Sequence, residues 1–329
     1  MNPKSVVFIG SGKLMLTLIK NIKKNPMFKI DGVIIASNRI MSRDKKSFMT
    51  NVNGGKIEKN LRRMKINFEF IDEIRTLDNS DLLNKHRSTV FVLGWHSIVP
   101  PKILNKHDVF GFHASLLPKN AGWAPLVWSL IDGEKETGVT LFKLDEGIDT
   151  GSIIAQESFR IEEKDDIRKL LRKTKKAVKK ICVHTSNQIA SGTWIEQKQN
   201  FALRTVRDKR EPMDGRIDFY KTCADIKNFV RAQSKPYPGA FIEFGDTHLI
   251  IDKIQIAENF IPTKVPGTPL VRGICIYIAA SDGWMKIKRP RSLSQYLKLL
   301  FKIRTEFQSA EHYNNKIDSK KPLLDKETS

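Results

Sequence analysis

Residues 109–156 read VFGFHASLLPKNAGWAPLVWSLIDGEKETGVTLFKLDEGIDTGSIIAQ and hold the densest alternation of apolar runs, turn residues and titratable groups in the chain. The apolar run 109–112 predicts a short buried strand that ends at His113. Residues 138–142 predict a second strand, and the glycine-flanked loop behind it carries Asp149. Both titratable side chains are therefore expected at the carboxyl end of a strand.

Strands and helices alternate in this part of the chain. Apolar runs at 5–9, 30–36 and 89–95 predict further buried strands. Pro125 opens a helical pattern that Gly133 ends, because proline suits the first turn of a helix and glycine suits its end. This alternation predicts an α/β fold, with a Rossmann-like N-terminal domain built on a mostly parallel sheet.

His113 and Asp149 are candidates for one acid/base site. Ligands of open α/β sheets bind outside the carboxyl ends of the strands, where a histidine and a carboxylate from neighbouring strands would meet. The alternatives are structural, since a histidine at a strand end often serves as a hydrogen-bonding residue and an aspartate between glycines often forms a turn. Spacing alone leaves both interpretations open.

A series of motifs in this region resembles the formyltetrahydrofolate-dependent formyltransferases. The series is HASLLP at 113–118, Gly122, Pro125, GVT at 138–140, GIDTG at 147–151 and Gln156. The family includes methionyl-tRNA formyltransferase, glycinamide ribonucleotide formyltransferase and the sugar N-formyltransferases. The resemblance implies that the N-terminal domain is catalytic, that His113 and Asp149 form the catalytic pair, and that N10-formyltetrahydrofolate is the formyl donor. No metal is implied, and no cluster of cysteines and histidines in the sequence suggests one.

Two positions depart from the family pattern. Gly111 lies where the family usually has a catalytic Asn, and Ala121 lies where it commonly has an Arg. Asn120 is the candidate to replace the missing side-chain donor in catalysis. The alternative for Asn120 is a turn residue, as its place in a loop suggests.

The segment from Thr89 to Pro101 resembles the family's GW…IP stretch, which lines the pterin pocket. Such a pocket combines main-chain donors and acceptors with apolar walls. A core strand with a proline exit explains the same residues. The residues expected at the folate are Trp95, Ile98, Val99, Leu116, Leu117, Asp145 and Gly147.

The acceptor substrate is expected beside the first strand and the start of the second domain. The GSG turn at 10–12 lacks the third glycine of a dinucleotide fingerprint, so it predicts a tight turn near the substrate and no NAD site. Arg231 either clamps a phosphate with its planar fork or caps the end of its own helix. The residues expected at the acceptor are Gly10, Ser11, Gly12, Ser115, Arg231, Lys235 and Tyr237.

The C-terminal part predicts a second, smaller domain. Residues 197–210 predict a linker, and the DGRI and PYPGAF segments that follow resemble the second unit of the family. Alternating strands at 248–257, 273–280 and 284–288 predict a small OB-like β-barrel. The expected domains are 1–203, 204–291 and 292–329, the last with an amphipathic helix and a disordered tail. The helix is expected to pack on the barrel, with a peripheral membrane contact as the alternative.

Composition narrows the class of protein. The chain has 329 residues, 40% of them hydrophobic, which suffices for packed cores in two domains. The cysteines, Cys182, Cys223 and Cys275, are too far apart for a disulfide framework, so a reducing compartment is expected. No apolar stretch reaches the length of a membrane span, and no signal-peptide pattern is present. We therefore expect a cytoplasmic protein.

The net charge of +21 allows two interpretations. It suits a polyanionic partner such as tRNA, a nucleotide-linked substrate or an anionic membrane surface. It also suits a solvated lysine-rich surface with no function, and the basic helix predicted at 165–190 fits either interpretation.

The acceptor implied by the resemblance is a nucleotide-linked amino sugar. The PYPGAF segment and the GW…IP stretch are closest to those of sugar N-formyltransferases, which act on substrates such as 4-amino-4,6-dideoxysugars for surface polysaccharide, including the O-antigen of lipopolysaccharide. Methionyl-tRNA is the alternative acceptor. A further alternative is a non-catalytic folate- or nucleotide-binding relative, because Gly111 replaces the usual Asn. A homodimer is left open.

Overall fold

The computed structural model describes residues 2–36, 54–71, 74–95, 97–258 and 264–318. The chain divides into two compact units. The N-terminal unit comprises Met1–Asp214 and Lys235–Pro238, and the C-terminal unit comprises Gly215–Ser234 and Gly239–Ser329. The predicted disordered tail lies largely beyond residue 318, outside the described residues. The functional division into 1–203, 204–291 and 292–329 stays a prediction.

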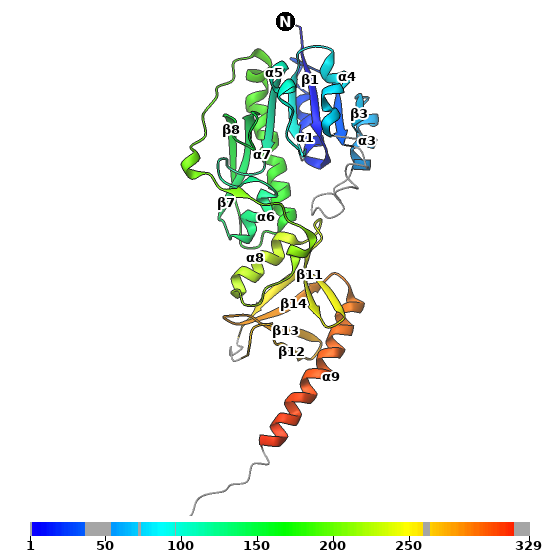
Figure 1. Ribbon diagram of the computed structural model, residues 1–329, viewed down its shortest axis with the longest axis vertical. Coiled ribbons are helices and arrows are strands. Elements are labelled where there is room, and N and C mark those ends of the chain that lie inside the picture. Colours follow the sequence, from blue (N-terminus) through cyan, green and yellow to red (C-terminus); the bar gives the residue numbers. More distant parts are fainter. Residues whose placement is uncertain (1, 37–53, 72–73, 96, 259–263, 319–329) are drawn as a thin grey trace, which may run out of the picture. The chain divides into compact units, whose positions relative to one another are not determined.

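A mixed sheet forms the centre of the N-terminal unit (Figure 1). Within the described residues its strand order is β3 (Phe68–Ile71), β2 (Phe28–Ala36), β1 (Lys4–Gly10), β4 (Thr89–Leu93), β5 (Asp108–His113), β7 (Glu136–Lys143) and β8 (Ile153–Arg160). The pairs from β3 to β5 are parallel. The pairs from β5 to β8 are antiparallel. The predicted α/β fold with a mostly parallel sheet is confirmed.

Helices cover both faces of this sheet. The helices of the unit are α1 (Gly12–Ile22), α3 (Gly54–Arg63), α4 (Asp81–Asn84), α5 (Pro101–Lys106), α6 (Pro125–Ile131) and α7 (Ile167–Ser191), with 3-10 turns η1 (Ile74–Asn79), η2 (Phe201–Leu203) and η3 (Pro212–Gly215), the last ending at the boundary of the two units. Residues alternate between two cores, as the period of a strand requires. Val6 and Phe8 of β1 pack with α1, α3 and α7, whereas Val7 and Ile9 pack with α4 and α5.

The direction of β7 follows from the segment before it. Residues 114–135 leave the carboxyl end of β5 and return to that end, where His113 pairs with Thr140. A parallel partner would need a crossover that carries the chain back to the amino end of β5. Strand β7 therefore runs antiparallel to β5, and β8 pairs antiparallel beside it. Short strands β6 (Ala121–Gly122) and β9 (Val206–Arg207) pair with each other in parallel.

In its described residues, the C-terminal unit consists of an antiparallel sheet and two helices. Its described strands have the order β10 (Ala240–Phe244), β11 (Thr247–Ala257), β14 (Trp284–Pro290), β13 (Cys275–Ala279) and β12 (Pro269–Arg272). The helices α8 (Cys223–Gln233) and α9 (Leu293–Asp318) share one apolar core with this sheet. The prediction of a smaller β domain after the α/β domain is confirmed.

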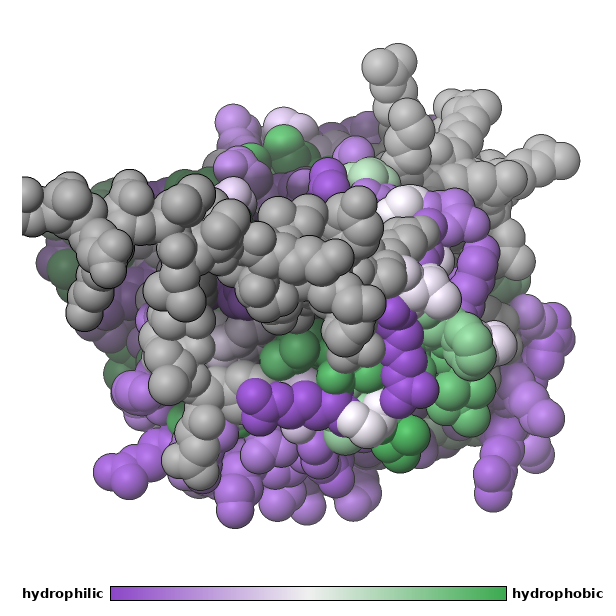
Figure 2. Space-filling model, turned by 90° about the horizontal axis from the view of Figure 1, so that it is seen from below, coloured by the Kyte–Doolittle hydropathy of each residue, from purple (hydrophilic) through white to green (hydrophobic). Residues whose placement is uncertain are grey.

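Helix α9 has one packed side and one exposed apolar stripe. Leu299, Leu300 and Ile303 are buried in the core of the unit, whereas Leu293 and Phe301 are exposed. Seen from below the view of Figure 1, hydrophilic side chains surround a smaller group of hydrophobic ones (Figure 2). Among the described residues, no helix is both long enough and apolar enough to cross a bilayer.

Candidate active site

His113 ends β5 and is held between two hydrogen-bonding groups. Its Nε2 lies 2.8 Å from the main-chain oxygen of Asn120. Because a carbonyl oxygen only accepts, Nε2 must carry a proton and donate it. Its Nδ1 lies 3.4 Å from Oδ2 of Asp149. Nδ1 is therefore the ring nitrogen that faces the carboxylate.

Asp149 reaches His113 by a route that differs from the prediction. The two residues were expected at carboxyl ends on one edge of the sheet, but β7 is antiparallel to β5, so its carboxyl end lies beside Val109, where the Leu144 N–H donates to the Val109 carbonyl. Asp149 returns to His113 in the loop between β7 and β8. The structure thus brings the predicted pair together, although the reasoning from strand ends was wrong.

The loop that carries Asp149 is shaped by its own polar groups. Oδ1 of Asp145 accepts from the Gly147 N–H at 3.1 Å and from Oγ1 of Thr150 at 2.6 Å. A Cβ on Gly151 would lie 1.7 Å from the Lys143 oxygen, so only glycine fits there. Asp149 itself has a left-handed φ of 53°, which aspartate tolerates better than most residues. Asp145 and Gly147, predicted at the folate, act here as turn formers.

The loop after His113 is fixed by buried hydrogen bonds. Oγ1 of Thr140 donates to the Ser115 carbonyl at 2.7 Å and accepts from the Leu117 N–H at 3.0 Å. Nε2 of Gln156 donates to the Leu117 carbonyl at 2.8 Å and to the hydroxyl of Thr140 at 2.9 Å. These contacts explain structurally why Ser115 and Leu117 are buried, and Leu116 lies half-buried between them.

Asn120 contacts His113 through its main chain and not through its side chain. Its amide group donates to Ser129 Oγ at 3.3 Å and to Glu134 Oε1 at 2.9 Å. Its Oδ1 accepts from Nε of Arg207 at 2.6 Å. Both amide hydrogens are used in this arrangement, so the predicted donor role of Asn120 requires these bonds to break.

Left-handed backbone concentrates in the same loop. Asn120, Gly122 and Ala124 all have positive φ, at 53°, 91° and 47°. Such positions cost free energy and persist where surrounding contacts hold them. Here the strained turn aims the Gly122 N–H at Oδ2 of Asp149, 2.8 Å away. The carboxylate is therefore held by one main-chain donor and faces one histidine nitrogen.

The position of the missing Asn is filled. A Cβ on Gly111 would lie 2.4 Å from Cδ1 of Leu144 and 2.7 Å from Cε1 of Phe142. Contacts this short require both neighbours to move. An Asn could be placed here only if Leu144 and Phe142 moved. In this chain the space of the Asn side chain is filled by these two apolar side chains.

The carboxyl ends of β1 and β4 form a second, glycine-rich part of this edge. Strand order reverses direction between these two strands, which is where open α/β sheets bind ligands. A Cβ on Gly10 would lie 2.0 Å from the Leu93 oxygen. The Ser11 hydroxyl donates to the Gly94 carbonyl at 3.3 Å and does not cap α1, which begins at Gly12.

Trp95 leaves a buried donor at this edge. Its Nε1–H is buried and has no hydrogen-bond partner among the described residues. A buried donor without an acceptor is costly, so such a group is a candidate for a ligand contact. Of the other residues predicted at the folate, Val99 is buried in the core and Ile98 is exposed.

The remaining predicted acceptor residues belong to both units. Nε of Arg231, on α8 of the C-terminal unit, donates to Oδ1 of Asn228 at 2.9 Å. Lys235 is exposed and precedes a cis peptide bond to Pro236 in the N-terminal unit. Burial raises the pKa of the Tyr237 phenol to about 12, so the hydroxyl stays neutral at physiological pH. Among the described residues, no group of three or more His, Cys, Asp or Glu could hold a metal ion.

Comparison with known proteins identifies the family. The family model described as formyl transferase matches residues 4–185, more than half of the chain. The chain belongs to the formyl transferase family. The model described as formyl transferase, C-terminal domain, matches residues 209–294. The resemblance drawn from the motifs between His113 and Gln156 is confirmed.

Relatives of this formyl transferase have different names. The bifunctional polymyxin resistance protein ArnA of Wigglesworthia glossinidia brevipalpis is 37% identical over 217 residues, which are 65% of this chain and 33% of that protein. The match thus spans about one third of ArnA. The methionyl-tRNA formyltransferase of Caldicellulosiruptor saccharolyticus is 28% identical over 294 residues, 86% of this chain and 90% of that protein.

Solved structures share the fold at low identity. The N-formyltransferase of Helicobacter canadensis, solved with folinic acid and dTDP-3-aminofucose, has a TM-score of 0.66 at 23% identity and covers 88% of this chain and 100% of its own. The methionyl-tRNA formyltransferase of Clostridium thermocellum has a TM-score of 0.51 at 20% identity, with 78% and 95% covered. At these identities the structures establish a common fold only.

Several residues around the pair were not predicted. Gln199, Arg204, Thr205 and Arg207 lie in the segment that the sequence predicts only as a linker. Oγ1 of Thr205 accepts from the Asn120 N–H at 2.8 Å. The Arg207 guanidinium pairs with Asp132 and lies 5.3 Å from the ring centroid of Trp128. Their partners are about 50 to 90 residues away in sequence, so no local pattern indicates these contacts.

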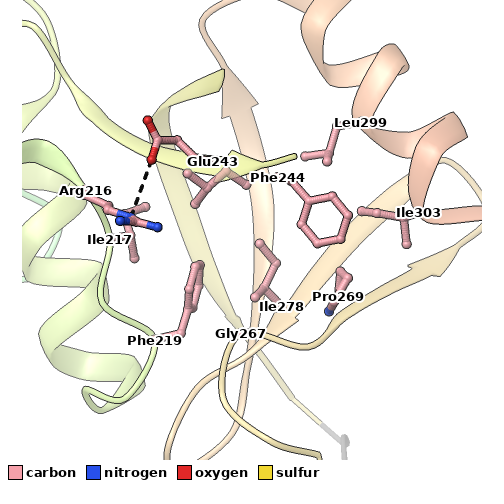
Figure 3. Close-up of a pocket in the computed structure, with 11 residues that line it drawn as sticks. Arg216, Ile217, Phe219, Glu243, Phe244, Gly267, Pro269, Ile278, Leu299 and Ile303 are labelled. Carbon is pink, nitrogen blue, oxygen red and sulfur yellow. Dashed lines mark ion pairs between the residues drawn. The ribbon is translucent and has the colours of Figure 1, made fainter. Parts of the chain in front are cut away.

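A cavity in the C-terminal unit of this formyl transferase is separate from the pair. It has a volume of about 160 Å³, and its lining includes the apolar side chains of Phe219, Ile278 and Leu299 (Figure 3). Arg216 and Glu243 form an ion pair of 3.6 Å on its wall. None of the residues predicted for catalysis or binding lines this cavity.

Proposed function

We propose that this formyl transferase moves a formyl group from N10-formyltetrahydrofolate to the primary amine of a nucleotide-linked amino sugar. The observation that carries the chemistry is the His113–Asp149 pair, with Nε2 fixed as a donor and Nδ1 facing the carboxylate at 3.4 Å. The pair suits proton transfer, because one proton can move between Asp149 and Nδ1 without reorienting the ring.

The roles of the two residues follow from the chemistry of the amine. The folate supplies the formyl carbon that the amine attacks. Asp149 accepts the proton that the amine loses and shares it with Nδ1 of His113. The positive charge of the imidazolium that results stabilises negative charge on the formyl oxygen, and the proton passes back from Nδ1 through Asp149 to the departing nitrogen. One C–N bond forms, one breaks, and the proton passes from the first nitrogen to the second.

The folate fits the carboxyl ends of β4 and β5. Trp95 offers an indole N–H that has no partner among the described residues, and a pterin carries acceptors for such a donor. Leu116, which is half-buried, and Ile98, which is exposed, supply apolar surface in the segments after these strands, whereas Val99 and Leu117 are buried in the protein core. Gly10, Ser11 and Gly12 offer main-chain groups at the point where strand order reverses.

The acceptor class is supported by the likeness to N-formyltransferases of sugars. The solved structure with dTDP-3-aminofucose matches over its whole length. The second candidate acceptor is methionyl-tRNA. It is favoured by the net charge of +21 and by curated relatives with that name. Helix α7 adds an exposed row of Arg172, Lys175, Lys176 and Lys179, and its 25 residues include no carboxylate.

Transfer to both acceptors across a salt series tests the assignment. The assay uses N10-formyltetrahydrofolate with dTDP-linked 3-amino and 4-amino dideoxysugars, and with methionyl-tRNA. We expect rapid formylation of one sugar with little loss at higher salt, because a sugar nucleotide contacts only one or two cations. A tRNA acceptor would lose affinity steeply with salt, by about 10³-fold or more between 50 and 200 mM. Steeply salt-sensitive transfer to methionyl-tRNA, with none to any sugar, would exclude the sugar acceptor.

Arg231 refines the sugar assignment. If its guanidinium binds the pyrophosphate, Arg231→Ala raises the Michaelis constant for the sugar nucleotide and leaves kcat nearly unchanged, because the contact is common to ground and transition states. An unchanged Michaelis constant would mean that Arg231 only makes its contact with Asn228 within α8.

The proposed product, a formylated sugar nucleotide, would be made in the cytoplasm and used for surface polysaccharide.

A further inference from the structure

Asp149 lies in a loop whose internal hydrogen bonds, from Gly147 and Thr150 to Asp145, do not involve the Asp149 carbonyl. Residues 145–148 are exposed, and Asp149 has a left-handed φ of 53°. Its carboxylate must nevertheless stay 3.4 Å from Nδ1 of His113. The main chain that carries the carboxylate therefore needs contacts from outside the loop.

Gln199 supplies two of these contacts. Its Nε2 donates to the Asp149 carbonyl at 2.9 Å and to the Gly151 carbonyl at 2.7 Å. The side chain is 8% exposed, and its Oε1 is buried without a partner among the described residues. An unpaired buried acceptor is costly, and the amide accepts this cost in order to donate both hydrogens of Nε2. The two donated bonds therefore set the orientation of the amide.

Arg204 supplies the others. Its Nη2 donates to the Ile148 carbonyl at 2.7 Å, and its Nη1 lies 3.4 Å from the Asp149 carbonyl. The rigid fork of the guanidinium donates to two successive carbonyls from two separate nitrogens. The Asp149 carbonyl thus accepts from Gln199 and Arg204 together.

The segment with these two side chains is itself anchored at both ends. Gln197 exchanges two main-chain hydrogen bonds of 2.8 Å with Ile153, at the start of β8. Thr205 donates to the Pro118 carbonyl at 3.3 Å and binds the Asn120 N–H through Oγ1. One segment therefore holds the main chain of Asp149 and also the residue whose carbonyl fixes His113.

We propose that Gln199 and Arg204 are positioning residues that hold the Asp149 carboxylate at its distance from Nδ1 of His113. The role rests on the proposed function, because it concerns the proton transfer assigned to that carboxylate. Neither side chain donates to the carboxylate or to the imidazole in the structure. They act through main-chain carbonyls, so their loss misplaces the carboxylate and leaves the reacting groups present.

Paired substitutions test the role. Gln199→Met keeps the side-chain length and removes the donors, Arg204→Met removes the guanidinium and leaves a shorter apolar side chain, and Gln199→Glu replaces the donor NH2 group with an acceptor oxygen. We expect each to lower kcat about tenfold or more while both Michaelis constants stay within about twofold, because small misplacement of a reacting group costs rate more than binding. Arg204→Lys, which keeps a cationic donor group but loses the planar fork, recovers part of kcat. Lys198→Met, an exposed neighbour on the same segment, is the control and keeps wild-type values.

A second readout does not depend on turnover. Amide hydrogen exchange of peptides covering residues 144–152 should be faster in Gln199→Met and Arg204→Met than in Lys198→Met, since the carbonyl contacts are lost. Unchanged exchange together with unchanged kcat would overturn the positioning role. A lower melting temperature with normal kcat per folded enzyme would overturn it too, because that result describes a purely structural contact.

A double substitution separates this role from the proposed function. In the Asp149→Asn background, Gln199→Met should lower turnover no further, because the carboxylate that it positions is gone. Additive losses would contradict the role. If Asp149→Asn and His113→Ala alone keep wild-type turnover, the proposed function fails. If they lose turnover while the Gln199 and Arg204 variants keep both kcat and slow exchange, only the positioning role fails.

Discussion

The carboxyl ends of β1 and β4 are shaped by main chain and glycine, whereas the carboxyl end of β5 is shaped by hydrogen-bonded side chains. At the first, the carbonyl of Leu93 occupies the space that a Cβ on Gly10 would need. At the second, His113, Asn120 and Asp149 are linked through Nε2, a carbonyl and a carboxylate. Rigid main chain suits the shape of a ligand, and a titratable pair suits proton transfer. In the proposed function, the first part of this edge contributes to binding and the second part carries the proton transfer.

The largest effect is expected at the carboxyl end of β5, the side-chain half of this edge, which holds His113 and Asp149. His113→Ala or Asp149→Asn should lower turnover on the order of a hundredfold or more, because acid/base groups contribute at that scale. Circular dichroism and the melting temperature should show folded protein in both variants. Rates near wild type in both would remove the assigned proton transfer, whereas loss in one variant only would break the idea that the two residues act as a pair.

Substitutions at the carboxyl ends of β1 and β4, the main-chain half of the edge, should change the free energy of unfolding. Gly10→Ala places a Cβ 2.0 Å from a backbone oxygen at a φ of 138°, and we expect a loss of about 3 kcal/mol or more of unfolding free energy. Gly12→Ala is the matched control, because nothing lies within 4 Å of its Cβ and only its φ of 85° is unfavourable. It should cost about 1 to 2 kcal/mol. Urea denaturation of the full chain, monitored by tryptophan fluorescence, measures the difference. Equal losses of unfolding free energy in the two variants would contradict the packing argument.

Gly111 lies in β5, which carries the side-chain half, and pairs with Val92 of β4, which belongs to the main-chain half. Gly111→Ala should cost about 1 to 3 kcal/mol of unfolding free energy, because its Cβ would lie 2.4 Å from Cδ1 of Leu144. Adding Leu144→Ala should relieve part of that cost, so the double variant is more stable than the sum of the single losses predicts. Strict additivity in urea denaturation would show that Leu144 is not the side chain that fills this position.

Regular structure was the part that sequence could predict. The helix predicted to open at Pro125 and to end before Gly133 is α6 (Pro125–Ile131), and the strands predicted at 109–112 and 138–142 are β5 and β7. These elements follow from local periodicity and from proline and glycine at their ends. The direction of β7 could not be predicted, because it depends on where residues 114–135 return to the sheet. The short strand β3 was missed, since its four residues carry too little periodicity.

The site was predictable only where motifs lie close in sequence. His113 and Asp149 belong to linked motifs, and the structure places them together. Gln199 and Arg204 bind the Asp149 loop across 50 and 55 residues from a segment with no distinguishing pattern. Asn120 was assigned a side-chain role, but its carbonyl makes the contact with His113. Main-chain contacts leave no trace in residue type, which is why sequence could not show them.

The smallest effect is expected at Trp95, next to Gly94 on the main-chain half. Trp95→Phe keeps an aromatic ring and removes the buried Nε1–H, which has no partner among the described residues. Since an unpaired buried donor is costly, ligand-free stability should stay equal or rise, by at most about 1 kcal/mol. Affinity for folinic acid, measured by calorimetry, should fall about fivefold to tenfold, the worth of one hydrogen bond. The opposite signs of the two changes are what a ligand-directed donor requires. Lower stability with unchanged affinity would instead make Trp95 a packing residue with no part in recognising the folate.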